Sequence, residues 1–89
     1  MKNQLESVRL DKWLWSVRLF KTRTQAQNAC KAGKVQVNGN ACKSSKGISI
    51  GDRITLQIRD QIREVTVEGL IEKRVSYPLA IQQYSEMEL

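Results

Sequence analysis

The side chains of this sequence that could do chemistry are mainly cationic, and they are unevenly distributed. Residues 1–46 contain ten lysines and arginines but only two acids, a net charge of +8. Residues 47–89 contain five basic and seven acidic residues, a net charge of −2, so the 89-residue chain carries +6. Clustered positive charge is typical of a surface that binds a polyanion. A solvated basic face is the alternative, and charge alone does not separate RNA from DNA or an anionic membrane.

The sequence contains few residues suited to catalysis or metal binding. It has no histidine, which excludes Ser–His and Cys–His nucleophile pairs and imidazole metal ligands. Cys30 and Cys42 lack the close spacing of a C-x-x-C zinc or redox site. We expect two free thiols, with a disulfide as the alternative. We therefore predict no catalytic residue, no metal site and no cofactor.

The length of 89 residues allows one small domain, whose core is too small for a large enzyme that encloses a substrate pocket. No apolar run approaches the roughly 20 residues of a membrane span, and the N-terminus shows no signal-peptide pattern. We therefore expect a soluble, cytoplasmic, monomeric protein with neither a membrane nor a small-molecule partner.

Two helices over about residues 9–32 must position many of the cations. The apolar stripe of the first helix has helical spacing and consists of Leu10, Trp13, Leu14 and Val17. Asp11, Lys12 and Arg18 fall outside this stripe. Asp11 stands in the first turn, where an acid complements the helix dipole or orients a nearby arginine. Trp15 also lies off the stripe, which leaves base stacking as an alternative, but we expect it to pack against the protein.

The second helix begins with a capping box, in which Thr22 is the N-cap and Gln25 the third helical residue. Gly33 suits a left-handed residue that ends this helix. We expect the side packed against the first helix to carry small residues, namely Ala26, Ala29 and Cys30. Small side chains there allow the two helices to approach closely.

From residue 34 onward, apolar residues alternate with polar ones, which indicates strands. Asn38-Gly39 predicts a hairpin turn, and Asp60-Gln61 predicts a second one. Between them, Ile54, Leu56 and Ile58 should face inward, and a strand over 62–68 should return beside them. Near the C-terminus, we expect Ser76 to cap a short helix that contains Pro78 and continues to Tyr84.

These elements predict an α+β fold with two short packed helices, a small twisted and mostly antiparallel β-sheet, and a short C-terminal helix. We divide the chain into four segments. Residues 1–7 form a flexible N-terminus, and residues 8–58 form the binding domain. Residues 59–76 add a strand or hairpin region to the same domain, and residues 77–89 form a C-terminal helix or tail.

Four segments in this order resemble the S4 RNA-binding domain family: 9–14 (RLDKWL), 21–26 (KTRTQA), 33–39 (GKVQVNG) and 51–54 (GDRI). The tryptophan-rich first helix and the second hairpin are similar to the stand-alone heat shock protein 15 type. The resemblance implies an S4-type fold and a non-catalytic protein that binds large-subunit rRNA and tRNA on stalled or dissociated ribosomal subunits. That role is ribosome rescue, or ribosome-associated quality control.

The resemblance also implies which residues contact RNA. Arg9 and Arg23 are the first candidates, because the planar arginine fork can bind two phosphate oxygens. Thr24 marks a helix N-terminus whose N–H groups suit an anion. The further candidates are Lys12, Lys21, Lys34, Arg18, Gln27 and Lys31. Solvated or salt-bridged side chains are the alternative for the arginines.

Two other functions use similar residues. The chain could be the RNA-binding module of a pseudouridine synthase or a tRNA ligase, but it is too short for either catalytic domain, and we expect it to be complete rather than a fragment. It could also be a small DNA-binding helix-turn-helix protein. The second helix offers mainly Gln27, Asn28 and Lys31 for base reading, which favours the RNA-binding interpretation.

Overall fold

The computed structural model describes residues 6–87, so residues 1–5 of the predicted flexible segment 1–7 and residues 88–89 lie outside the described part. The elements are β1 (Val8–Arg9), α1 (Leu10–Ser16), α2 (Arg23–Lys31), β2 (Val35–Val37), β3 (Asn40–Ala41), β4 (Gly47–Ile48), β5 (Arg53–Ile58), β6 (Gln61–Val67), α3 (Tyr77–Ala80), the 3₁₀ helix η1 (Ile81–Gln83) and β7 (Tyr84–Met87). The predicted α+β class, with short helices and a mostly antiparallel sheet, is confirmed.

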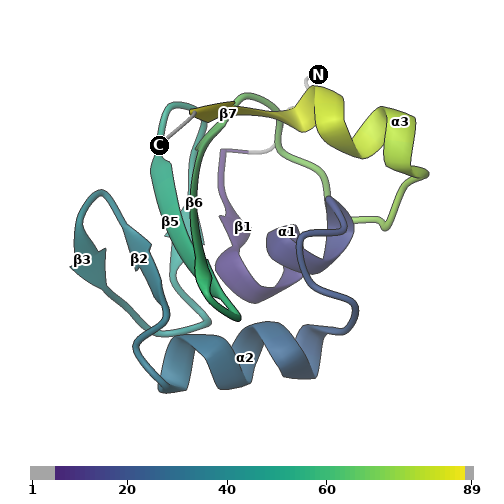
Figure 1. The fold of residues 1–89 in the computed structure, drawn as a ribbon. Coiled ribbons are helices and arrows are strands. Elements are labelled where there is room, and N and C mark those ends of the chain that lie inside the picture. The colour runs from purple at the N-terminus through teal and green to yellow at the C-terminus, as the bar shows by residue number, and fades with distance from the viewer. Residues whose placement is uncertain (1–5, 88–89) are drawn as a thin grey trace.

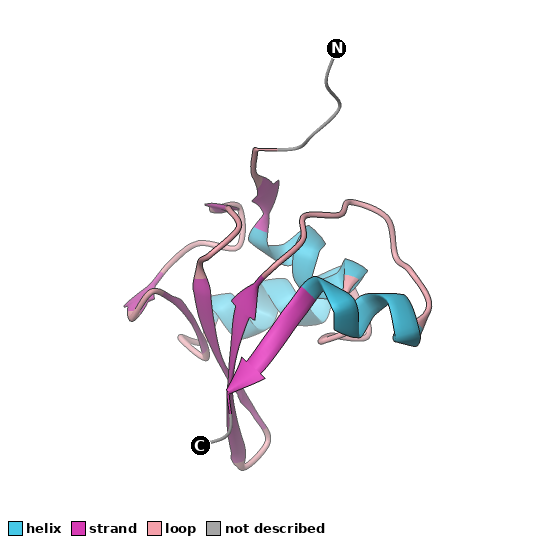
Figure 2. Ribbon diagram, turned by 90° about the horizontal axis from the view of Figure 1, so that it is seen from above, coloured by secondary structure: helices cyan, strands magenta, loops and turns pink. Residues whose placement is uncertain are grey.

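The main sheet has five strands in the order β3-β2-β5-β6-β7, and each neighbouring pair is antiparallel. The short strands β1 and β4 form a separate antiparallel pair, in which Arg9 lies opposite Gly47. Figure 1 shows α2 and α3 at opposite ends of the molecule, with α1 between them. Figure 2 shows α3 leading into β7, which forms one edge of the sheet.

The apolar stripe of α1 is confirmed. Its buried residues are Leu10, Trp13, Leu14 and Val17. The helix ends at Ser16, with Val17 as its C-cap, and Arg18 takes a left-handed conformation with φ of 62°. Asp11 lies off this stripe in the first turn, as expected, yet its side chain is completely buried. Partners on α2 and β1, described below, make this burial tolerable.

Helix α2 begins and ends as its sequence predicts. The Thr22 hydroxyl accepts a hydrogen bond from the Gln25 backbone N–H at 3.0 Å. The Gln25 side chain accepts from the N–H of Lys21 at 3.2 Å, one residue earlier than in a standard capping box. After the helix, Gly33 has φ of 75°, which glycine adopts without steric strain. The inward side of α2 carries Ala26, Cys30 and the partly buried Ala29.

One predicted hairpin turn is confirmed and the other is shifted by one residue. Asn38 and Gly39, with φ of 53° and 86°, connect β2 to β3. The second turn is Arg59–Asp60 rather than Asp60–Gln61, because Gln61 already pairs with Ile58. The continuous ladder between β5 and β6 sets this position. As a result, Arg59 itself adopts a left-handed conformation with φ of 57°.

The C-terminal segment differs from the expected helix. Ser76 is the N-cap of α3 and Pro78 lies in its first turn, but the helical conformation ends at Gln83. Tyr84 begins β7, which pairs with the outer edge of β6. The sequence analysis did not predict this strand. Its formation satisfies backbone groups of β6 that would otherwise remain an open sheet edge.

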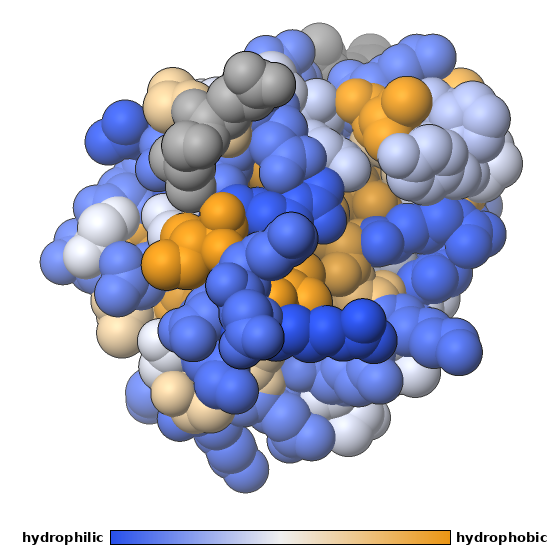
Figure 3. Space-filling view, in the orientation of Figure 1, coloured by the Kyte–Doolittle hydropathy of each residue, from blue (hydrophilic) through white to orange (hydrophobic). Residues whose placement is uncertain are grey.

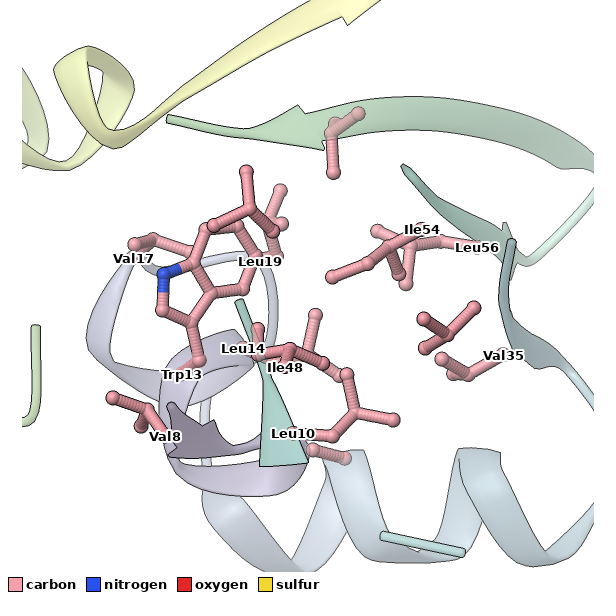
Figure 4. Close-up of a cluster of buried hydrophobic side chains, with 14 of the residues drawn as sticks. Val8, Leu10, Trp13, Leu14, Val17, Leu19, Val35, Ile48, Ile54 and Leu56 are labelled. Atoms are coloured by element: carbon pink, nitrogen blue, oxygen red, sulfur yellow. The ribbon is translucent and has the colours of Figure 1, made fainter. Parts of the chain in front are cut away.

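Hydrophilic side chains cover most of the face shown in Figure 3, and the apolar patches on it are small. The apolar side chains instead gather between α1 and the concave side of the sheet (Figure 4). Val35, Ile54 and Leu56 from the sheet are buried there against α1. Ile58, at the end of β5, is only partly buried.

Trp13 links α1 to the C-terminal part of the chain. Its indole Nε1 donates to the carbonyl of Gly69 at 2.9 Å. Its ring packs edge-on against Tyr84, with 6.3 Å between ring centroids and 71° between ring planes. Trp13 therefore holds the segment after β6, and β7, against the helical side of the molecule.

We expect Trp13→Phe to lower the free energy of unfolding by about 2 kcal/mol, because the Gly69 carbonyl loses its donor and the smaller ring leaves a void. Urea denaturation measures the change. Trp15→Phe is the matched control, since Trp15 is only half-buried and lies under Arg74 at 5.7 Å. Trp15→Phe should lower the free energy of unfolding by less than about 1 kcal/mol. Equal losses in the two variants would contradict the role given to Trp13.

Candidate nucleic-acid interface

The predicted site is organised around the buried carboxylate of Asp11, which accepts four hydrogen bonds. Arg9 binds both oxygens, through Nε at 3.1 Å and Nη2 at 3.0 Å. Gln27 donates from Nε2 at 2.8 Å, and Arg23 from Nη2 at 3.4 Å. The Asp11 side chain is 0% exposed, whereas those of Arg9 and Arg23 are 50% and 40% exposed. We call these four residues the Asp11 cluster.

Arg9 is positioned by the short β1–β4 pair, which places it directly before α1. The first N–H groups of α1 are capped by backbone carbonyls of the loop before β4. Leu10 donates to Lys46 at 2.8 Å, and Asp11 donates to Ser44 at 3.0 Å. This loop is therefore held beside the Asp11 cluster by the unsatisfied donors of a helix N-terminus.

Arg23 and Gln27 come from α2. They are four residues apart, so both side chains lie on the same face of the helix. The Thr22 cap sets where α2 begins and hence which residues face Asp11. Arg9 and Arg23 therefore lie near the same end of the helix pair, where they share Asp11 as their carboxylate partner.

The electrostatics of the cluster keep Asp11 ionised. Burial by itself raises the pKa of Asp11, but hydrogen bonds from Arg9 and Gln27 and the charges of Arg23 and Arg9 outweigh it, so the pKa lies below its ordinary value. The same hydrogen bond and charge raise the pKa of Arg9. The cluster thus presents two permanently charged guanidinium groups whose positions are set by one buried anion.

A groove adjoins the Asp11 cluster, and we call it the first groove. Its volume is about 540 Å³, and it is lined by Arg9, Gln27, Asn28, Cys30, Lys31, Cys42, Lys43, Ser44 and Ser45. Among the described residues, no aspartate or glutamate lines it. Three cations with hydroxyl and amide groups between them suit several phosphate groups at once.

The cysteines in this groove do not form a reactive or metal-binding site. Cys30 and Cys42 are free, as predicted. Burial, with the nearby Cys42 and Asp11, raises the pKa of Cys30 to about 11. Burial also raises the pKa of Cys42. Neutral thiols are poor nucleophiles and poor metal ligands, and within residues 6–87 no group of three or more metal-ligating side chains occurs.

The structure separates the remaining predicted residues. Lys31 lines the first groove, while Thr24 is exposed in the first turn of α2. Lys21 and Lys34 line a different concavity on the other flank of α2. Lys31 thus lies on one flank of α2, and Lys21 and Lys34 lie on the other, so the predicted residues do not form one continuous patch.

Two predicted contacts have partners inside the protein. Lys12 forms a salt bridge with Glu72 at 3.3 Å. Arg18 donates from Nε to the carbonyl of Val75. Both side chains are turned toward the segment after β6, so they are poorer candidates for RNA contact than the Asp11 cluster.

Lys43, which is not among the predicted RNA contacts, also lines the first groove. The available signal was the pair of lysines that flank two serines, within the strongly basic half of the chain. Which helix end this loop caps is a tertiary contact that the sequence pattern does not reveal.

A known protein family matches the part of the chain that contains the candidate site. The family model of the S4 domain matches residues 8–54, which contain the whole Asp11 cluster and the first groove. The chain belongs to the S4 domain family. The recognition of this family from four short motifs is thus confirmed.

Relatives of this S4 domain chain are similar over most of its length. The heat shock protein 15 homolog of Aeromonas salmonicida is 43% identical over 81 residues, which are 91% of this chain and 61% of that protein. The RQC P-site tRNA stabilizing factor of Helicobacter pylori is 42% identical over 60 residues, 67% of this chain and 71% of that protein. The chain thus spans about three fifths of the heat shock protein 15 relative.

A solved structure shows the same S4 fold. Vibrio cholerae heat shock protein 15, described as trimeric, superposes with a TM-score of 0.88 at 43% identity, covering 92% of this chain and 83% of that one. The expectation of a monomer for the present chain stays a prediction. None of these relatives is named for a catalytic activity. No helix in the described part of this S4 domain chain is long and apolar enough to span a membrane.

The depressed pKa of Asp11 makes stability depend on pH. Because folding lowers the pKa of Asp11, the ionised carboxylate stabilises the folded protein at pH values above its unfolded-state pKa of about 3.9. This contribution is lost as the pH falls through the folded-state pKa. We expect Asp11→Asn to lower the free energy of unfolding at neutral pH by about 2 kcal/mol and to flatten the acid-side loss.

Urea denaturation over a series of pH values measures both effects. Asp60→Asn is the matched control, since Asp60 is an exposed residue of the β5–β6 turn. If Asp11→Asn keeps the pH profile of the wild type, Asp11 is not the group that titrates.

Proposed function

We propose that this S4 domain protein is a non-catalytic RNA-binding factor that uses the Asp11 cluster and the first groove to hold structured RNA. The observation that carries the proposal is the pair of half-exposed guanidinium groups held by one buried carboxylate. Each guanidinium keeps N–H groups for a phosphate, while its orientation is already set by Asp11.

Several features favour an RNA backbone as the ligand. Lys31 and Lys43 extend the positive charge of Arg9 along the first groove. A groove of cations, amides and hydroxyls suits phosphate and 2′-OH contacts, by which proteins recognise folded RNA. The structure disfavours base reading by α2 in a DNA groove, because the Gln27 amide is already engaged with Asp11.

We further propose that the RNA is large-subunit rRNA together with tRNA, and that the partner is a stalled or dissociated large ribosomal subunit. The names of two relatives support this step, since one is a heat shock protein 15 homolog and the other is named for stabilising P-site tRNA. The protein would then act in ribosome rescue or ribosome-associated quality control, in the cytoplasm.

Binding should depend strongly on salt. Neutralising about five phosphates predicts a slope of log K against log salt near −4 to −5, or a few-hundred-fold weakening from about 50 to 200 mM salt. Fluorescence anisotropy with a labelled rRNA fragment measures the slope. An affinity nearly independent of salt would contradict phosphate binding.

The ribosomal assignment predicts co-sedimentation with the large subunit. In a sucrose gradient of cell lysate, tagged wild type should migrate with the large subunit. The double variant Arg9→Ala/Arg23→Ala should stay near the top, and circular dichroism must show that it is folded, because both arginines also pair with buried Asp11. Removing two phosphate-binding arginines should weaken binding at least tenfold.

The control for this experiment is Arg53→Ala/Lys73→Ala, which also removes two positive charges. Both residues are exposed, and neither lines the first groove. This variant should migrate like the wild type. A wild type that stays at the top of the gradient would refute the ribosomal assignment and leave RNA binding to be tested separately.

A further inference from the structure

A second groove lies on the other flank of α2 from the Asp11 cluster. Its volume is about 510 Å³, and its lining includes Phe20, Lys21, Gln25, Lys34, Ile58 and Arg59. It thus combines the connection between α1 and α2, one side of α2 and the far end of β5. Asn28 lines both grooves, so only the width of α2 separates them.

The charges in the second groove are unpaired. Lys21, Lys34 and Arg59 come from three different segments, and among residues 6–87 none of them forms a salt bridge. No acidic residue of the described part lines the groove. Elsewhere the protein neutralises its own cations, as in the pair of Arg63 with Glu86 at 2.7 Å. The second groove therefore presents positive charge suited to an anionic partner.

The backbone of Arg59 has a left-handed conformation, which glycine and asparagine adopt more easily than arginine. Its φ of 57° lies in the left-handed region, where glycine or asparagine is favoured in a two-residue turn. An arginine there is slightly strained, and strain of this kind often marks a functional position. Arg59 lines the second groove from this turn.

Part of the lining of the second groove is apolar. Phe20 and Ile58 are partly buried and line it, together with amide groups of Gln25, Asn28 and Gln57. An aromatic ring, amides and cations together are the groups with which proteins bind an unpaired nucleotide, stacking the base and neutralising the phosphate.

We propose that the second groove binds an unpaired nucleotide of the RNA whose structured part is held at the Asp11 cluster. The base packs on Phe20, and Lys21, Lys34 and Arg59 contact the flanking phosphates. A helix with its side chains is about 10 Å wide, which about three or four nucleotides span at roughly 3.4 Å each. This inference rests on the proposed function, because it adds a contact to the same RNA.

Two RNA probes test the inference: a short blunt duplex, and the same duplex with a single-stranded tail of about five nucleotides. Wild type should bind the tailed probe about tenfold more tightly than the blunt one. Lys34→Ala/Arg59→Ala should abolish this advantage and leave the affinity for the blunt probe nearly unchanged. Arg9→Ala/Arg23→Ala should weaken binding of both probes.

A charge-neutral variant separates stacking from general electrostatics. Phe20→Leu should lose most of the tail's advantage without changing the salt slope, and circular dichroism should show that it is folded. Arg53→Ala/Lys73→Ala, whose residues lie outside both grooves, should keep the full advantage.

The outcomes distinguish the two proposals. If wild type binds neither probe, the proposed function fails. If it binds the blunt duplex through Arg9 and Arg23 but gains nothing from the tail, only the second groove is refuted. Equal weakening of both probes by Lys34→Ala/Arg59→Ala would also overturn the inference. So would a poly-glutamate peptide that binds wild type as tightly as the tailed probe and loses binding in that variant, since the groove would then suit an acidic protein segment.

Discussion

The burial of the Asp11 carboxylate is the constraint on which the candidate site depends. A carboxylate without solvent is tolerated only when charged or hydrogen-bonding partners surround it. Arg9, Arg23 and Gln27 supply those partners from β1 and α2. The requirement that Asp11 be satisfied therefore sets both how α1 and α2 are docked and where two arginines emerge at the surface.

An acid in the middle of a cationic site lowers its net charge but improves its order. Arginine side chains lose substantial rotamer entropy when a ligand immobilises them. In this protein Asp11 restricts Arg9 and Arg23 before any ligand arrives, while about half of each side chain stays exposed. Preorganisation of this kind compensates for the weaker long-range attraction.

The acidic half of the chain also shapes the basic surface. Glu64, Glu72 and Glu86 pair with cations of the protein itself, including Lys12 of the basic half. The net charge of +8 for residues 1–46 therefore overstates what a ligand meets. Five of the cations that form no salt bridge among the described residues line the two grooves on the flanks of α2, namely Lys21, Lys31, Lys34, Lys43 and Arg59.

The sequence by itself determined the features that depend on neighbouring residues. The stripe of α1, the Thr22 cap, Gly33 and the Asn38-Gly39 turn each rest on contacts within a few positions, so short-range patterns predict them. Only the tertiary structure decided that Asp11 is buried, that Lys12 is neutralised by Glu72, that Arg59 enters the turn, and that β7 completes the sheet. Their energies come from partners distant in the chain or from the register of a whole ladder, because burying a charge or pairing a strand is favourable only once those partners are in place.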